Sequence, residues 1–253
     1  GGGKVLREGV GVWIGRSSHN TVSHNDISDL VYTGVSVGWS WGYAPSSANH
    51  NVIEYNHIHD LGKGVLSDMG GIYTLGIAPG TTLRFNLIHD VQSYSYGGWG
   101  IYPDEGSSYL LIENNVVYDT KTGGFHQHYG RGNVVTNNIF AFSKEDNIVR
   151  TREEPHTSFF FERNIVIFDN GRLLGSNWSD EDFWIDSNVY WDASGQPVTF
   201  QGATFDEWKA RGHDQNSVIA DPLFVDAQNR DFTLKPESPA IPLGFNPIDT
   251  GRI

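Results

Sequence analysis

Apolar and polar residues alternate in a motif that recurs along most of the chain, each time around an asparagine. The copies lie between residues 20 and 192 and read NTVSHNDISD, NVIEYNHIHD, TLRFNLIHD, LIENNVVYD, VVTNNIFAF, FFERNIVIFD and WIDSNVYWD. Alternation of this kind, as around Ile53 and Ile58, is the period of a strand with one buried face. The asparagines are 31, 30, 29, 23, 26 and 24 residues apart, and they are Asn25, Asn56, Asn86, Asn115, Asn138, Asn164 and Asn188.

A repeat of this length predicts one coil of a parallel β-helix, with about three short strands joined by turns. Asparagine tolerates the left-handed turn conformation, and stacked asparagine amides can form a hydrogen-bonded ladder. We therefore assign these asparagines to the scaffold. Leucine-rich repeats need a denser leucine pattern, and propeller blades need ~40 residues or more. The expected fold is all-β, a right-handed parallel β-helix of about seven coils.

The end of the chain departs from the repeat. Thr204 and Glu207 have the spacing of a capping box, which predicts a short helix through Trp208 that ends near Gly212. The proline-punctuated tail that follows is expected to cover the last coil, whose strand edges would otherwise be exposed. We expect one domain, with a β-helix and a side-face cleft over residues 1–200 and a capping segment over 201–253.

A second set of segments lies between the asparagine strands and aligns on glycine. The segments are GVSVGW (34–39), GIYTLG (71–76), GIYPDEG (100–106), GFHQHYG (124–130) and, more loosely, NIVRTR (147–152). The first aligned position is apolar throughout and is expected to point inward; it holds Val35, Ile72, Ile101, Phe125 and Ile148. The next position is then expected to form an outward row of Ser36, Tyr73, Tyr102, His126 and Val149.

Stacking these segments is expected to gather reactive side chains in one cleft. Equivalent residues of neighbouring coils lie ~4.8 Å apart, so Asp104 should lie beside His128. Asp68 comes just before the segment at 71–76. Two carboxyl groups on adjacent coils can cleave a glycosidic bond, one protonating the leaving oxygen while the other attacks carbon or activates water. The candidate catalytic residues are Asp68, Asp104 and Glu105.

Residues around these acids are expected to bind a sugar chain. Glycine-rich and aromatic loops at 38–47, 59–71 and 91–100 leave room and supply flat apolar walls. Guanidinium groups recognise hydroxyl and carboxylate groups. The candidate substrate-binding residues are Tyr73, Tyr102, His126, His128, Trp39, Trp41, Trp99, Arg150, Arg152, Glu153 and His156.

Each of these candidates has a structural alternative. The acids can cap turns, the two histidines can pack as a stacked pair, and the tryptophans can pack loops on the solenoid. The run from Arg150 to Glu153 can form a salt-bridged loop. His57, His59 and His89 adjoin the ladder, and we assign them to the scaffold.

Charge narrows the set of partners. The formal net charge is −13 with only 17 Lys and Arg, which disfavours nucleic acid and strongly anionic polysaccharides. Without cysteine the chain has no disulfide and no thiolate ligand, and no apolar run reaches the ~18 residues of a membrane span. Asp104, His126 and His128 could converge on a metal, but further ligands would have to come from other coils. We expect no metal, no cofactor and no membrane contact, and a monomer whose partner is a polysaccharide or oligosaccharide.

At these residues the chain resembles the bacterial right-handed parallel β-helix repeat proteins and, more narrowly, the β-helix domain of glycoside hydrolase family 141. The stretches SDMGGIYTLG, YPDEGS and GGFHQHYGR carry the resemblance, which extends over roughly residues 10–250. It implies an extracellular or periplasmic bacterial protein that degrades plant polysaccharide with fucosidase-type or xylanase-type activity. It also implies catalytic carboxylates at Asp68 and at Asp104 or Glu105. We expect a mature or partial chain without the N-terminal coils of that family.

Three functions compete at this point. A glycoside hydrolase is the expected one. A polysaccharide lyase is the second, because Arg150, Arg152 or His126 could act beside a neutralised uronate. A β-helix that binds glycans without catalysis is the third.

Overall fold

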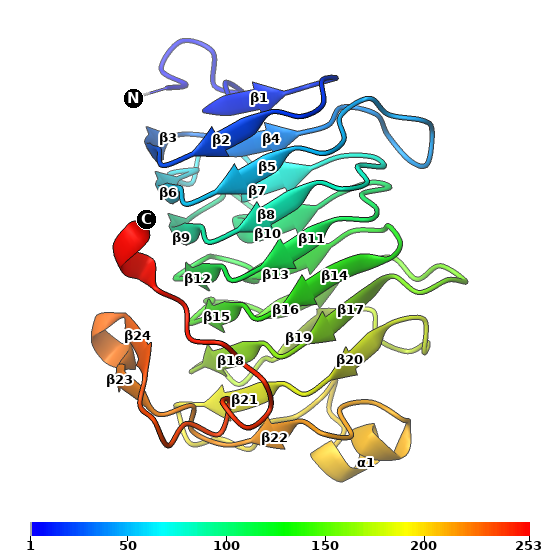
Figure 1. The fold of residues 1–253 in the computed structure, drawn as a ribbon, viewed down its shortest axis with the longest axis vertical. Coiled ribbons are helices and arrows are strands. Elements are labelled where there is room, and N and C mark those ends of the chain that lie inside the picture. The colour runs from blue at the N-terminus through cyan, green and yellow to red at the C-terminus, as the bar shows by residue number, and fades with distance from the viewer. Residues whose placement is uncertain (1) are drawn as a thin grey trace.

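The structure is a computed structural model that describes residues 2–253. The chain winds into a stack of coils with three parallel sheets along its sides (Figure 1). The first sheet, which carries the glycine-led segments, consists of β1 (Val12–Ile14), β4 (Val35–Val37), β7 (Gly70–Thr74), β10 (Trp99–Pro103), β13 (Phe125–Gln127), β16 (Ile148–Arg150) and β19 (Leu174–Ser176).

The other two sheets contain the asparagine motif. The second sheet consists of β2 (Thr21–Ser23), β5 (Val52–Glu54), β8 (Thr82–Arg84), β11 (Leu111–Glu113), β14 (Asn133–Thr136), β17 (Phe159–Glu162) and β20 (Trp184–Asp186). The third sheet consists of β3 (Asp26–Leu30), β6 (His57–Leu61), β9 (Leu87–Val91), β12 (Val116–Tyr118), β15 (Ile139–Ala141), β18 (Ile165–Phe168), β21 (Val189–Asp192) and β22 (Val218–Ile219). The predicted parallel β-solenoid is confirmed.

The asparagine ladder forms at the corner between the second and third sheets. Each side-chain amide donates to the next asparagine's Oδ1 over 2.9–3.4 Å, from Asn25 through to Asn188. The left-handed turn itself was placed on the wrong residue. The residue before each asparagine has the positive φ, of 50–58°, and the asparagine itself follows the turn and forms the hydrogen bonds of the ladder. These preceding residues are His24, Tyr55, Phe85, Asn114, Asn137, Arg163 and Ser187.

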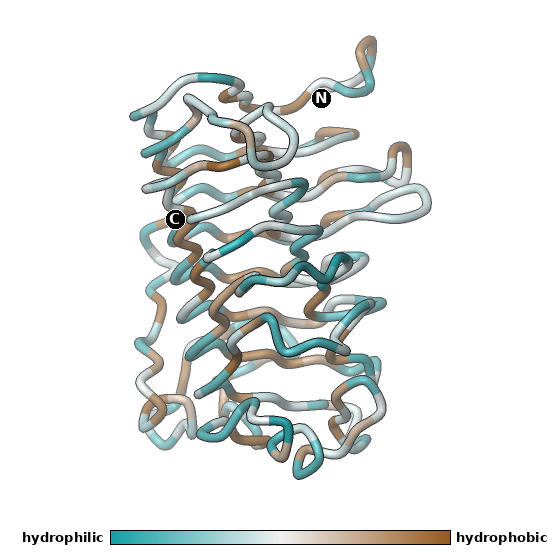
Figure 2. Tube along the Cα trace, turned by 90° about the vertical axis from the view of Figure 1, so that its right-hand side faces the viewer, coloured by the Kyte–Doolittle hydropathy of each residue, from teal (hydrophilic) through white to brown (hydrophobic). Residues whose placement is uncertain are grey.

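The predicted alignment of the first sheet is confirmed residue by residue. Val35 pairs with Ile72, Ile72 with Ile101, Ile101 with Phe125, and Phe125 with Ile148. All five side chains are fully buried in the core inside the coils. Apolar segments recur at successive levels of the stack, and loops project from one side of it (Figure 2). The adjacent residues of these strands therefore face outward, toward the loops.

The C-terminal region closes one end and one side of the solenoid. Thr204 and Glu207 form the predicted capping box of α1 (Phe205–Ala210), and its buried Trp208 packs on Phe200 at the last coil. The tail does more than cover that coil. It contains η1 (Ala227–Asn229), η2 (Thr250–Arg252) and the hairpin of β23 (Phe224–Asp226) and β24 (Asp231–Leu234), and it returns along the third sheet (Figure 1). Over residues 2–253, no helix has the length and apolar character needed to cross a bilayer.

Candidate functional site

A groove of about 810 Å³ lies over the outer face of the first sheet, between β10, β13 and the loops that precede β7 and β10. Seven of the residues singled out from the sequence line it. Its lining consists of Asp68, Ser95, Tyr96, Gly97, Trp99, Tyr102, Asp104, Glu105, Thr122, His126, His128, Glu145, Asp146, Val149, Thr151 and Ser176.

Asp104 follows β10 and is held from two sides. The Tyr73 hydroxyl donates to Asp104 Oδ2 over 2.6 Å, and His128 Nδ1 lies 3.0 Å from Oδ1. The expected proximity of Asp104 and His128 is thus present. Burial alone would raise the pKa of this carboxyl, but hydrogen bonds from His128, Tyr73 and Tyr102 and from the Glu105 backbone outweigh it and hold the pKa below the usual value. Asp104 is therefore an anion at neutral pH.

Asp68 approaches the same groove from a loop. It has a left-handed backbone with φ of 56°, and its N–H donates to Tyr96 O over 3.1 Å. A Cβ on Gly97 would lie 2.8 Å from that nitrogen, so the close approach of the two loops requires glycine there. The Tyr102 hydroxyl donates to Asp68 Oδ1 over 3.0 Å. Burial and the nearby charge of Asp104 raise the pKa of Asp68, although the Tyr102 bond opposes them.

The two tyrosines link the two acids. Their rings meet edge to face with centroids 5.2 Å apart, in the outward row that the alignment predicts. Burial and the charge of Asp104 raise the pKa of both hydroxyls, Tyr73 and Tyr102, so both stay protonated and act as donors. As donors, the two tyrosines contact two carboxyl groups of one groove, Asp68 and Asp104, whose pKa values are shifted in opposite directions.

The two histidines have different environments. His126 is buried and stacks on Tyr102 at 4.7 Å, and its Nε2 lies 3.0 Å from Thr151 Oγ1. Burial lowers the pKa of His126 to about 3, so this ring is neutral. The hydrogen bond with Asp104 raises the pKa of the half-buried His128. Because the rings turn to different partners, they do not converge with Asp104 on the metal position that their spacing allowed.

Glu105 and the tryptophans complete the surroundings. Glu105 Oε2 accepts from the Tyr129 hydroxyl over 3.0 Å. Trp99 is buried and packs on Tyr102 and His126, with ring centroids at 4.3 and 4.2 Å. Trp39 and the exposed Trp41 lie outside the groove lining. They extend an aromatic row from Tyr73, with ring centroids at 6.2 Å to Trp39 and then 5.4 Å to Trp41.

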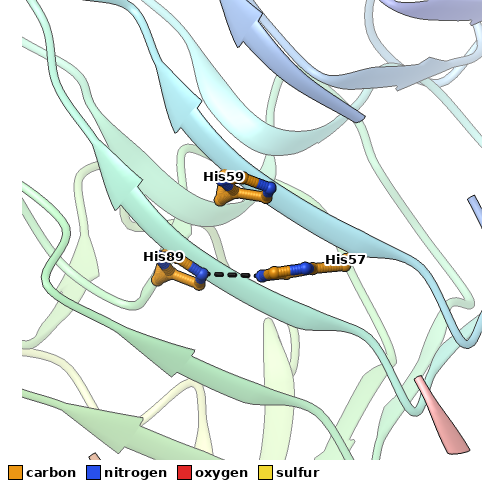
Figure 3. A group of neighbouring side chains, drawn as sticks. All are labelled: His57, His59 and His89. Atoms are coloured by element: carbon orange, nitrogen blue, oxygen red, sulfur yellow. Dashed lines mark hydrogen bonds between the residues drawn. The ribbon is translucent and has the colours of Figure 1, made fainter. Parts of the chain in front are cut away.

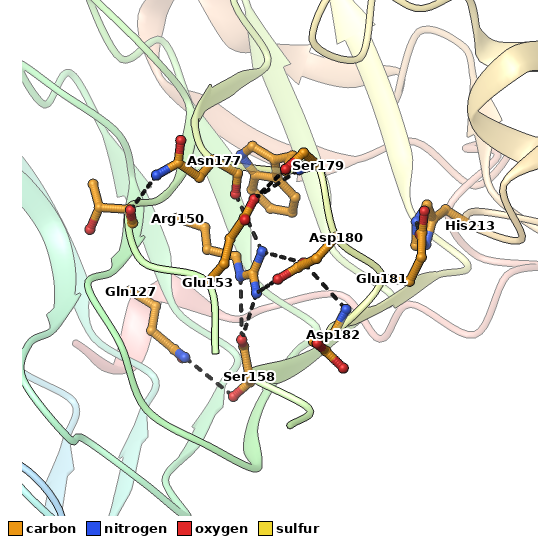
Figure 4. A network of polar contacts seen from close by, with 12 residues as sticks. Gln127, Arg150, Glu153, Ser158, Asn177, Ser179, Asp180, Glu181, Asp182 and His213 are labelled. Atoms are coloured by element: carbon orange, nitrogen blue, oxygen red, sulfur yellow. Dashed lines mark hydrogen bonds and ion pairs between the residues drawn. The ribbon is translucent and has the colours of Figure 1, made fainter. Parts of the chain in front are cut away.

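Arg150 has to be reassigned. Its guanidinium is fully buried, donates to both Asp180 oxygens over 2.7 and 2.9 Å and also bonds Ser158 Oγ (Figure 4). Period-2 alternation explains the error, because Arg150 pairs with Gln127 two positions after the inward Phe125 and so points inward as well. Arg150 is a buried scaffold residue and offers no group to a substrate in the groove.

The other three residues of that loop also lie outside the groove lining. Arg152 stacks over the Tyr129 ring at 4.3 Å, and Glu153 accepts from the backbone and hydroxyl of Ser179 (Figure 4). His156 Nε2 lies 3.2 Å from the Tyr43 hydroxyl. These contacts fit the structural alternative, in which interactions between its own side chains and their neighbours hold the loop in place.

Two acids of the groove lining were missed. Glu145 and Asp146 lie in the turn before β16, where Asp146 pairs with Arg172 at 2.8 Å. Burial raises the pKa of Asp146. The sequence contained a usable signal, since Asp146 occupies the position directly before an aligned segment, as Gly70, Trp99 and Gly123 do in the other coils.

The chain matches a known family, and it is also similar to two other proteins. A family model described as "Right handed beta helix region" matches residues 4–167. The chain is 27% identical over 193 residues to the uncharacterized protein YwoF of Bacillus subtilis (strain 168), an alignment that covers 73% of this chain and 36% of YwoF. It is similar to a chain in a structure titled "The complex structure of XylC with xylose", with 14% identity, a TM-score of 0.48 and coverage of 82% and 39%. The chain therefore spans well under half the length of either protein.

Proposed function

The chain belongs to the right-handed β-helix family, and from that premise we propose that it is a glycoside hydrolase that cleaves a neutral polysaccharide or oligosaccharide in the groove. One observation carries the proposal: Asp68 and Asp104 line the same groove and have pKa values shifted in opposite directions. A pair of acids separated in this way supplies the proton donor and the anion that glycosidic cleavage needs.

The proposed roles follow from the two environments. Asp68 is the general acid: its raised pKa keeps the proton that it gives to the glycosidic oxygen as the C–O bond breaks. Asp104 is the anion, which either attacks the anomeric carbon or takes a proton from the water that attacks it. Tyr73 and His128 position Asp104, and Tyr102 positions Asp68. If Asp104 attacks the anomeric carbon, water then breaks the glycosyl–Asp104 bond and gives a proton to Asp68. If Asp104 activates the water, the proton that it takes passes through solvent to Asp68, and either route restores both acids.

The groove favours a neutral sugar over a uronate. Its lining contains five carboxyl groups and, among the residues described, neither lysine nor arginine. A lyase would need a cation to neutralise the uronate carboxylate, and Arg150, one of the three residues that the sequence offered for elimination together with Arg152 and His126, is buried in an ion pair. The proposal also includes a plant-type polysaccharide as the substrate, a narrower relation to glycoside hydrolase family 141 and an extracellular or periplasmic location.

Aromatic residues are proposed to hold the sugar rings. Tyr96, whose side chain is exposed, and Trp99 line the groove on the side of Asp68. Flat apolar rings pack on the C–H faces of pyranoses. Glu105 and Glu145, which also line the groove, can accept hydrogen bonds from sugar hydroxyls.

Single substitutions test the assignment. We expect Asp68→Asn and Asp104→Asn each to lower kcat on neutral plant glycans by about 10²-fold or more, because each removes a proton transfer or the anion. Asp206→Asn, an exposed acid of α1, is the matched control and should retain full turnover. Release of reducing ends measures hydrolysis, and near-ultraviolet absorbance of an unsaturated product would identify a lyase instead. Unchanged turnover in both groove variants would reject the proposal.

A further inference from the structure

Three histidines gather on the outer face of the third sheet, a different side of the solenoid from the groove. His57 and His59 lie on β6 and His89 lies on β9, where it is the register partner of His59. The Nε2 atoms of His57 and His89 are 2.8 Å apart, and one ring nitrogen from each histidine lies within 4.8 Å of the others (Figure 3). Among residues 2–253, these histidines are the one group of three or more His, Asp or Glu side chains whose ligand atoms lie close enough together to hold a single ion.

Carboxylates orient two of these rings. His59 Nδ1 lies 2.9 Å from Asp60 Oδ2, and His89 Nδ1 lies 2.7 Å from Asp90 Oδ2. Both aspartates have a left-handed backbone, with φ of 53° and 52°, which turns each side chain back onto the histidine before it. A carboxylate on Nδ1 fixes the tautomer that leaves Nε2 for coordination, as the outer shell of metal-binding histidines does.

Asp26 approaches the cluster but stands outside the group of three. Its Oδ1 on β3 lies 3.2 Å from His59 Nε2, yet the atoms that all lie within 4.8 Å of one another come from the three histidines alone. Two ligands of a tetrahedral zinc ion, each ~2.0–2.1 Å from the metal, are about 3.3 Å apart. The Nε2 atoms of His57 and His89, now 2.8 Å apart, need to part by about half an ångström to reach this value.

We propose that His57, His59 and His89 form a binding site for a divalent transition-metal ion of the Zn²⁺ type, with solvent as the fourth ligand. Imidazole nitrogen selects Zn²⁺, Ni²⁺ or Cu²⁺ over Mg²⁺ and Ca²⁺, which prefer oxygen ligands. The sequence analysis assigned these histidines to the scaffold, and the ring stacking of His59 on His89 at 5.0 Å fits that assignment. Stacking alone, however, does not account for the converging nitrogens or for the carboxylates on Nδ1 of His59 and His89.

The ion would join two consecutive coils. Its ligands come from β6 and β9, which are neighbours in the third sheet near the N-terminal end of the stack. Because it would bind the folded arrangement and not the unfolded chain, it would raise the melting temperature by an amount that grows with the logarithm of its concentration relative to Kd. The role is structural, since the ligands lie on another sheet than the groove.

The experiment uses the full chain without a histidine tag, stripped with a chelator and titrated with Zn²⁺ in a calorimeter. We expect one ion per chain and a Zn²⁺-dependent rise in Tm. His57→Ala and His89→Ala should abolish both, and Asp90→Asn should weaken the affinity about 10–100-fold while the fold is retained. His50→Ala is the control, because His50 stacks on His19 at 5.0 Å without a third ligand.

Two results would overturn the site. One is native-like Zn²⁺ affinity in both His57→Ala and His89→Ala. The other is binding by the native protein that is no tighter to Zn²⁺ than to Mg²⁺. Bound Co²⁺ gives an independent measurement, since an intense visible absorption indicates a tetrahedral site, whereas the weak bands of octahedral Co²⁺ would contradict the geometry.

Discussion

At the residue scale, Asp68 and Asp104 differ in their surroundings alone. Asp104 accepts from a phenol and an imidazole, which lower its pKa, whereas Asp68 is half-buried beside that negative charge, which raises its pKa. Two tyrosines control these pKa values: Tyr73 donates to Asp104, whereas Tyr102 donates to Asp68 and also lowers the pKa of Asp104. The difference between the pKa values of the acids can therefore be changed from outside the acids themselves.

Removal of the Tyr73 hydroxyl should shift one limb of the pH–activity profile, and removal of the Tyr102 hydroxyl should shift both. In Tyr73→Phe, Asp104 loses a donor that lowers its pKa, so the acidic limb should move to higher pH. In Tyr102→Phe, Asp68 loses the bond that opposes its raised pKa and Asp104 loses a donor as well, so the basic and the acidic limb should both move to higher pH. We also expect kcat/KM to fall about 10-fold in each variant, from the loss of one positioning hydrogen bond.

The measurement is kcat/KM between about pH 3 and pH 9, the range that brackets carboxyl groups with shifted pKa values. Tyr94→Phe is the matched control, because Tyr94 is an exposed tyrosine outside the groove lining. Profiles of both groove variants that superimpose on the native profile would contradict the division of roles between Asp68 and Asp104.

At the scale of the element, the sequence predicted the positions of side chains correctly wherever the repeat sets the register of the strands. Alternation along a strand and the stacking of coils together placed Tyr73 beside Tyr102 and Asp104 beside His128. Where those rules were applied incompletely, the prediction failed. Arg150 was treated as a loop residue although it shares the inward parity of Phe125 through its partner Gln127.

Positions outside the strands could not be derived in this way. The approach of Asp68 depends on loop-to-loop contacts such as its N–H bond to Tyr96 O, and no periodic signal encodes such contacts. The three histidines show a third case. Their register follows from the repeat, but the convergence of the Nε2 atoms depends on rotamers set by Asp60 and Asp90.

The ladder makes the central asparagines stability-determining elements. Asn115 is fully buried, donates to Leu83 O and Asn138 Oδ1 and accepts from the backbone N–H of Asn86. Asn115→Ala should lower the free energy of unfolding by about 3 kcal/mol, because buried partners on both neighbouring coils lose their bonds. Urea unfolding followed by circular dichroism measures the loss.

Asn25→Ala is the comparison at the end of the ladder. Asn25 is more exposed and bonds Asn56 on one side, so its loss should cost about 1 kcal/mol or less. Equal costs at Asn115 and Asn25 would mean that the ladder adds nothing beyond the individual hydrogen bonds.

At the scale of the whole molecule, each coil contacts mainly its neighbours, so stability is approximately a sum of local terms. The proposed metal site lies toward the N-terminal end, the groove covers the middle, and α1 closes the C-terminal end (Figure 1). Trp208 anchors that closure. It is fully buried, stacks on Phe200 with centroids 5.2 Å apart and donates from Nε1 to Asp214 Oδ2 over 2.8 Å.

Trp208→Ala should therefore destabilise the coils at the C-terminal end of the solenoid and leave the groove folded. Large-to-small replacement of a buried tryptophan costs about 3–5 kcal/mol, and here it also removes one of the side-chain donors to the buried Asp214. Because the loss of stability spreads only through neighbouring coils, hydrogen exchange should accelerate in β20, β21 and β22 and stay slow in β7 and β10. Zn²⁺ binding and turnover should persist at temperatures below the first unfolding transition. The control is Phe245→Ala, which opens the side of the third sheet and should accelerate exchange in β15 and β18. If Trp208→Ala instead raised exchange evenly along the whole stack, the solenoid would unfold as one cooperative unit, and the groove would depend on the cap as strongly as on its own coils.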